Sequence, residues 1–182
     1  MEAVEFFIIN GQTCLIGHDG VARKLTPSDR DAIGFILENM KKFFPQSVER
    51  LEEWATDSIS NKPYFEYRIV DRFIRCNFGE ADFLKPDVEV GIFHFEEVHC
   101  PLRGICKDEG VICKPKPVLP ISDEEAKVVG LYTKGFLPGE IANKLGKAEQ
   151  TCKNQIWSAC KKLKLPNPRW LFRLFSLYEI TI

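Results

Sequence analysis

The sequence predicts an α+β N-terminal domain with a cysteine-rich loop, followed by an all-α domain of four helices. Strand-like alternation marks the start of the chain, and apolar residues at spacings of three and four dominate its last third. Between them, the segment 114–120 alternates proline with other residues. Such a segment favours extended geometry and acts as a semi-rigid spacer, so we expect one domain over 1–117 and a second over 118–182.

Strands are expected at two places in the N-terminal domain. The apolar segments 4–10 and 13–16 flank Asn10-Gly11, a dipeptide typical of tight hairpin turns. The segment 88–94 alternates apolar and polar residues and predicts a further single strand.

Three helices are expected between these strands. Polar residues at 26–29 open a helix that runs to Phe43, with apolar residues on one face. A second helix is expected over 47–55. The pattern of 64–76 is ambiguous between helix and strand, and we favour a helix.

In the second domain, two helices are expected to meet at a tight turn. Ile141, Ala142 and Leu145 share one face of a short helix, and Gly146 can adopt the left-handed conformation that ends it. A helix follows over 148–164, with a polar and partly basic outer face formed by Glu149, Gln150, Lys153, Asn154 and Ser158. Its expected buried stripe is Cys152, Ile156, Ala159, Cys160 and Leu163. Two helices in this arrangement are typical of a helix-turn-helix that binds DNA.

Two flanking helices are expected to complete the second domain. Ser122 with Glu125 three residues later is the signature of a capping box, which begins the first of them. Asn167 can cap the last helix, with Pro168 at its first position.

Several of these residues fall in the order of a known motif. They are Ser122-Asp123-Glu124-Glu125, Val128, Gly135, Glu140-Ile141-Ala142, Leu145, Thr151-Cys152-Lys153-Asn154, Ile156, Lys162-Leu163 and Asn167. In this order they resemble the LuxR-type (GerE-type) C-terminal domain of bacterial transcription regulators. The resemblance implies binding of double-stranded DNA, as a homodimer, with 148–164 as the recognition helix. The chain departs from the family pattern at Ala148, Cys152 and Gln155, where the family commonly has Ser, Val and His.

The resemblance also implies which side chains face DNA. With neighbouring polar positions, the expected set is Lys147, Glu149, Gln150, Thr151, Lys153, Asn154, Gln155 and Lys161. Gln and Asn side chains can read adenine, and Lys can contact guanine or phosphate. From Val118 onward the chain has ten Lys+Arg against six Asp+Glu, whereas the whole chain has a net charge of −1. A modest positive excess therefore lies in the part expected to meet phosphates.

The seven cysteines suggest a second site. Cys100, Cys106 and Cys113 lie in a loop rich in Pro and Gly, and Cys76 can supply a fourth ligand, with His99 or His94 as a substitute. Four such ligands suit a structural zinc ion, and four thiolates also suit an iron–sulfur cluster. The spacing matches neither a common zinc module nor a ferredoxin, and ordinary free thiols, with no metal, remain an equal alternative.

Motifs of other protein classes are missing from the sequence. It has no Walker loop, no Gly-x-Gly-x-x-Gly and no Gly-x-Ser-x-Gly, so we do not expect an enzyme. No apolar run is long enough for a membrane span and the start has no signal-peptide pattern, so we expect a cytoplasmic protein. Two alternatives stay open: an adaptor whose helical module binds only protein, and a redox protein built on the cysteines. The signal sensed by the first domain is not indicated.

Overall fold

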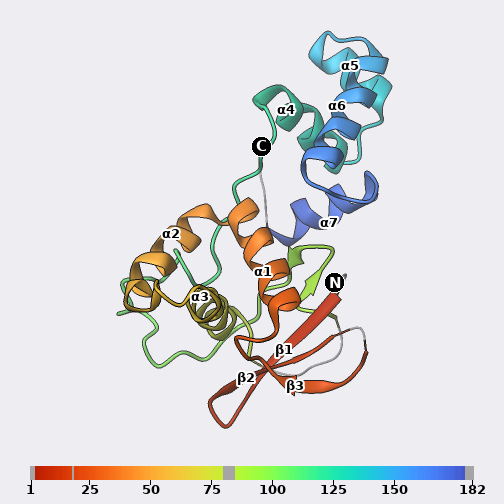
Figure 1. Ribbon diagram of the computed structural model, residues 1–182. Coiled ribbons are helices and arrows are strands. Elements are labelled where there is room, and N and C mark those ends of the chain that lie inside the picture. Colours follow the sequence, from red (N-terminus) through yellow and green to blue (C-terminus); the bar gives the residue numbers. More distant parts are fainter. Residues whose placement is uncertain (1–2, 18, 80–84, 179–182) are drawn as a thin grey trace. The chain divides into compact units, whose positions relative to one another are not determined.

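The structure, a computed structural model, describes residues 3–17, 19–79 and 85–178 (Figure 1). The chain divides into two units, Met1–Val118 and Leu119–Ile182. The boundary lies one residue later than the sequence suggests because Val118 N–H donates to the Phe43 carbonyl at 2.7 Å. Residues 114–118 are thus bonded to the first unit, and they do not act as a free spacer.

The first unit contains an antiparallel five-stranded sheet in the order β3-β2-β1-β4-β5. The strands are β1 (Ala3–Ile9), β2 (Gln12–Ile16), β3 (Ala22–Lys24), β4 (Val88–Glu89) and β5 (Ile92–Phe93). The hairpin expected at Asn10-Gly11 is confirmed, since Ile9 pairs with Gln12 and both turn residues have positive φ angles of 49° and 72°. This is the backbone that a two-residue turn between twisted strands requires.

The prediction of one strand over 88–94 is wrong. Val90 and Gly91 form a second tight turn with φ angles of 52° and 76°, and Glu89 pairs with Ile92 across it. Gly91 has a positive φ that other residues adopt only under strain, and a Cβ atom there would lie 2.2 Å from Oδ1 of Asn39 and displace that side chain. Alternation alone did not reveal this reversal of the chain.

Three helices accompany the sheet: α1 (Arg30–Phe43), α2 (Pro45–Trp54) and α3 (Lys62–Asn77), with a short 3-10 turn, η1 (Thr56–Ser58), between the last two. The three expected helices are confirmed, with shifted starts. The helix α3 begins before Tyr64 because Asn61 caps it, accepting a hydrogen bond from Tyr64 N–H at 3.3 Å. None of the helices in the described residues is both long enough and apolar enough to span a membrane.

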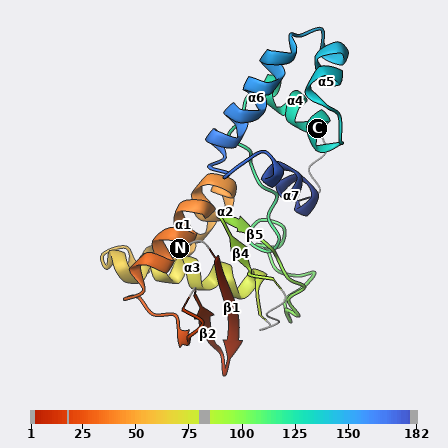
Figure 2. The ribbon, with the colours of Figure 1, turned by 90° about the vertical axis from the view of Figure 1, so that its right-hand side faces the viewer.

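A cluster of phenylalanines forms the core between these helices and the sheet, whose backbones are drawn in Figure 2. Phe44, where α1 ends and α2 begins, lies centrally, with its ring centroid 5.4 Å from those of Phe93 and Phe95 and 5.9 Å from that of Phe73. Each fully buried ring of this kind contributes roughly 1.5–3 kcal/mol of hydrophobic stabilisation. Apolar burial therefore fixes the helices against the strands.

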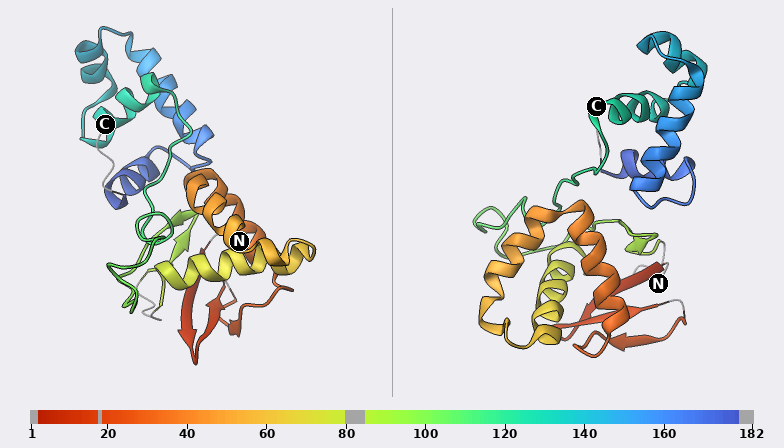
Figure 3. Two further views of the ribbon diagram at one scale, coloured as in Figure 1. Left: turned by 90° about the vertical axis from the view of Figure 1, so that its left-hand side faces the viewer. Right: turned by 45° about the horizontal axis from the view of Figure 1, so that its top comes forward.

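The second unit consists of four helices, α4 (Asp123–Thr133), α5 (Pro138–Leu145), α6 (Glu149–Lys162) and α7 (Arg169–Leu177) (Figure 3). The capping box expected at Ser122 and Glu125 is present at the start of α4. Gly146 has a φ of 62° and ends α5, as expected. Asn167 Oδ1 accepts from the Arg169 N–H at 3.0 Å at the start of α7. The second unit therefore has the four helices that the sequence predicts.

Polar bonds hold the long loop that follows the sheet to the helices of the first unit. The buried Asp108 carboxylate accepts from Arg50 Nε at 2.7 Å and from Arg72 Nη2 at 2.5 Å. Ser47 Oγ donates to the Val111 carbonyl at 2.6 Å, and Asn77 Nδ2 donates to that of Ile112 at 2.8 Å. The second half of this loop is therefore fixed to α2 and α3.

We expect Asp108→Asn to lower the free energy of unfolding by about 2 kcal/mol, because it leaves two partly buried guanidinium groups without their carboxylate. Urea unfolding of the full chain, with hydrogen exchange of the α3 amides, measures this loss. Glu53→Gln is the control, since Glu53 is the exposed partner of Arg50 and its loss should cost little. Equal losses in the two variants would contradict the anchoring role of Asp108.

Candidate nucleic-acid interface

The helix α6 follows α5 after a turn of three residues, Gly146, Lys147 and Ala148. The left-handed Gly146 reverses the chain, and the Lys147 N–H donates to the Ala142 carbonyl at 3.0 Å. Ala148 has the extended conformation of an N-cap residue but supplies no side-chain cap. The turn is therefore built by the backbone, and the first turn of α6 keeps N–H groups without a side-chain cap.

The inner face of α6 packs against α4 and α5. The expected stripe of Cys152, Ile156, Ala159, Cys160 and Leu163 is buried. Burial raises the pKa of the Cys160 thiol to about 11, so it is protonated at neutral pH and serves as a small apolar side chain. This packing determines which residues of α6 face outward.

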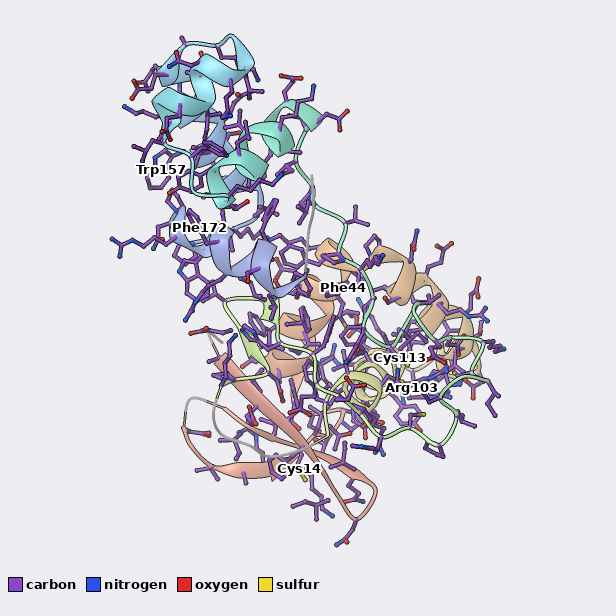
Figure 4. All side chains as sticks on the ribbon, turned by 180° about the vertical axis from the view of Figure 1, so that it is seen from behind. Cys14, Phe44, Arg103, Cys113, Trp157 and Phe172 are labelled. Carbon is purple, nitrogen blue, oxygen red and sulfur yellow. The ribbon has the colours of Figure 1, made fainter. Side chains whose placement is uncertain are left out.

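The outer face of α6 is polar and exposed. Its side chains recur at spacings of three and four, so they form one row along a helix that is ~21 Å long. The row comprises Gln150, Lys153, Asn154, Trp157 and Lys161. Trp157 is 58% exposed and lies on the outside of the helix (Figure 4).

Two interactions order the start of this row. Lys153 Nζ lies 2.7 Å from Glu149 Oε1, with both side chains about half exposed. Gln150 Nε2 donates to Asn154 Oδ1 at 3.0 Å. These are exposed pairs worth little energy, so a ligand with its own charges and hydrogen-bonding groups can displace them.

Lys147 and Gln155 are half-buried, in contrast to the outer row. Lys147 Nζ lies 2.6 Å from Glu124 Oε2 and 3.3 Å from Gln155 Oε1. Hydrogen bonds from Lys127 and Lys147 lower the pKa of Glu124 to about 2. Lys147 and Gln155 thus connect the turn and α6 to α4.

The carboxylate of Glu125 is the main polar connection between α4 and α6. It is buried and accepts from Ser158 Oγ and from Lys162 Nζ, each at 2.7 Å, as well as from Ser122 N–H at 2.8 Å. Burial raises the pKa of Glu125, but these hydrogen bonds outweigh it and lower the pKa to about 2. Ser158, which the helical pattern placed on the outer face, is therefore directed toward α4.

Of the eight residues expected to contact DNA, six are exposed: Glu149, Gln150, Thr151, Lys153, Asn154 and Lys161. Lys147 and Gln155 are half-buried, so their side chains are only partly accessible to DNA. The sequence analysis missed Trp157, although it lies four residues after Lys153 and three after Asn154, on the same face of the helix. Comparison with models of protein families, with curated proteins and with solved structures gave no match for this chain.

The four expected metal ligands lie in the first unit. Cys76 is in the last turn of α3, Cys100 and Cys106 are half-buried in consecutive turns, and Cys113 is buried. Cys14 lies apart from Cys113 (Figure 4). The structure therefore brings the C-terminal end of α3 and the loop together.

A separate group of carboxylates also lies in the first unit. Oxygens of Glu5, Asp87 and Glu96 are within 4.8 Å of one another. Asp87 Oδ2 accepts from Phe6 N–H at 2.6 Å, and Glu96 Oε2 accepts from Gly79 N–H at 2.6 Å. These carboxylates satisfy backbone donors, which is a structural role.

We expect Glu125→Gln to destabilise the second unit by roughly 2–3 kcal/mol at pH 7, because the amide cannot pair with Lys162 as the carboxylate does. The folded-state pKa is about 2, below the ordinary 4.5, so the stabilisation is complete above pH 4.5. It disappears as the pH falls from 4.5 through 2. The difference between variant and native protein should shrink over that range.

Hydrogen exchange of the α4 and α6 amides at several pH values measures this difference in the full chain. Glu124→Gln is the matched control, since the neighbouring Glu124 is exposed and its ion pairs are screened by solvent. A pH-independent difference between Glu125→Gln and the native chain would contradict the interpretation.

Proposed function

We propose that the protein is a DNA-binding transcription regulator whose helix α6 enters the major groove of double-stranded DNA. The observation that carries the proposal is the outer face of α6, an exposed row of amide, ammonium and aromatic side chains on a helix whose opposite face is packed against α4 and α5. A helix presented in this way, after a short turn from a preceding helix, has the geometry with which helix-turn-helix proteins read DNA.

The chemistry of the row suits the edges of bases. Gln150 and Asn154 carry amides that can bond to adenine N6 and N7, and they lie one helical turn apart. Lys153 can contact guanine or phosphate, and Glu149 can accept from the amino group of cytosine. Thr151, at the N-terminal turn of α6, suits a phosphate contact together with the N–H groups that Ala148 leaves uncapped.

The charge of the second unit supports the same partner. Lys161 lies on the outer row, and no ion pair involves it in the part of the chain that the structure describes. Lys153 is held only by an exposed pair with Glu149. Both ammonium groups can therefore turn to phosphates at little cost, and the release of counterions from DNA would favour binding.

The order of motifs that resembles LuxR-type domains supports the proposal independently of the exposed face. By that resemblance the regulator binds as a homodimer on a symmetric site, since two-fold protein symmetry matches a palindromic site. The first unit then senses a signal or contacts another protein.

Trp157 favours a second candidate, an adaptor that uses the same face of α6 to bind a protein. An exposed tryptophan is typical of the centre of a protein interface. Trp157→Ala separates the candidates. The substitution should weaken binding to duplex DNA only modestly, whereas it should abolish binding to a protein partner if Trp157 anchors that partner.

We expect Lys153→Ala to weaken binding to all duplex sequences and to reduce the slope of log K against log salt by about one unit, because one phosphate contact is lost. Fluorescence anisotropy with a labelled duplex over a range of salt concentrations measures both effects. Lys62→Ala is the control, because Lys62 is an exposed lysine of the first unit.

An unchanged slope in Lys153→Ala would remove this residue from the phosphate contacts. Failure of the native chain to bind duplex DNA at low salt would overturn the proposed function.

Glu149→Gln should strengthen non-specific binding several-fold at low salt. The change removes a negative charge close to the phosphates and frees Lys153 from its partner at 2.7 Å. The same anisotropy titration measures the gain, with Glu53→Gln in the first unit as the control. A loss of affinity for one sequence alone would instead indicate that Glu149 reads a base.

A further inference from the structure

The first half of the segment 98–114, which we call the cysteine loop, directs large apolar side chains to solvent, whereas Ile112 in its second half is buried. Leu102 is 53% exposed and Ile105 is 80% exposed, whereas Cys113 is 9% exposed. Cys100 and Cys106 are half-buried. Apolar burial therefore does not explain the fold of the first half of this loop, which carries Cys100 and Cys106.

The segments that carry Cys76 and Cys113 are joined directly, since Asn77 bonds to the backbone of Ile112 and of Lys114, on either side of Cys113. Burial raises the pKa of Cys76 to about 12, and Cys113, which is hydrogen-bonded to it, and Cys100 add to the shift. Burial also raises the pKa of Cys113, and both Cys106 and Cys100 contribute to this shift. Each thiol is thus close enough to others of the set to affect their ionisation.

The backbone holds the four cysteines at these positions without any contribution from a metal. Arg103 N–H donates to the Cys100 carbonyl at 3.0 Å and Cys106 N–H donates to that of Leu102 at 2.9 Å, so successive turns bring Cys106 back toward Cys100. Asn77, beside Cys76, accepts from Lys114 N–H at 2.7 Å, which fixes the residue after Cys113. The two ends of the set are therefore joined through one asparagine side chain.

We propose that Cys76, Cys100, Cys106 and Cys113 bind one Zn²⁺ ion, which joins the cysteine loop to the end of α3. Four protein thiolates around zinc leave no open position, which is the arrangement of structural sites. Binding converts four thiols and Zn²⁺ into a tetrathiolate complex and releases four protons, with no change of oxidation state.

The sulfurs must move to close around the ion. With Zn–S bonds of ~2.3 Å, tetrahedral ligands lie ~3.8 Å apart, whereas among the described residues no three of these four sulfurs lie within 4.8 Å of one another. Cys100 and Cys106 are in exposed turns, so rotation of their side chains between staggered conformers can bring them to the ion.

Arg72 and Arg103, which also pair with Asp108 and Glu109, partly offset the negative charge of the complex. Four thiolates and Zn²⁺ carry a net charge of −2. Arg72 acts to lower the pKa of Cys76 and Arg103 that of Cys113, so both cations lie near the sulfurs. Figure 4 shows Arg103 and Cys113 in the same part of the first unit. These cations favour the thiolate form that binds a metal.

The test is the metal content of the full chain purified under reducing conditions. We expect one zinc per chain by elemental analysis, and none after Cys106→Ser or Cys100→Ser. Cys14→Ala is the matched control and should keep its zinc, since Cys14 is a buried cysteine of β2 outside the set. In addition, Co²⁺ added to the metal-free native chain should give the absorption bands of tetrahedral cobalt–thiolate coordination.

The Co²⁺ titration of the native chain keeps the test valid where a variant fails to fold. Zinc retained in Cys100→Ser and Cys106→Ser would overturn the proposal, as would a native chain that binds neither metal. Iron with sulfide at the four cysteines, or a disulfide between Cys76 and Cys113, would also overturn it. None of these results depends on DNA binding by the second unit, so the two proposals fail separately.

Discussion

The buried Glu125 carboxylate holds the second unit in the arrangement on which its proposed function depends. It accepts hydrogen bonds from the N-cap residue of α4 and from Ser158 and Lys162 on α6. A buried carboxylate is costly unless it is paired, so α6 can adopt few orientations about its axis that satisfy Glu125. The orientation that does so also buries the apolar stripe of α6 and leaves Lys153 and Asn154 in solvent.

The first unit combines two kinds of stabilisation. A phenylalanine core joins its helices to the sheet, whereas polar and charged bonds to Asp108, Asn77 and Ser47 hold its cysteine loop. Such bonds add little net stability individually because the same groups also bond to water. The proposed metal ion would supply stabilisation that the exposed Leu102 and Ile105 do not.

Much of the fold could be predicted because local chemistry decides it. Asn10-Gly11 defines a hairpin, Ser122 with Glu125 defines a helix start, and Gly146 defines a helix end, and the structure has each of them. The turn at Val90-Gly91 escaped prediction because Val90 has a positive φ, which β-branched residues rarely adopt. Six of the eight residues expected to contact DNA are exposed, but Trp157 was overlooked and Ser158 was placed on the wrong face.

By itself the sequence determined that the chain divides into two parts, which segments have helical periodicity and how polar residues are spaced along α6. These features follow from neighbours within about four positions. Only the tertiary structure decided which polar side chains remain available. Lys147 and Gln155 are drawn toward Glu124, and Ser158 and Lys162 toward Glu125, by contacts with another helix. The tertiary structure also decided that the end of α3, with Cys76, lies beside a loop more than twenty residues later in the chain. This contact depends on packing and long-range hydrogen bonds that no local pattern encodes.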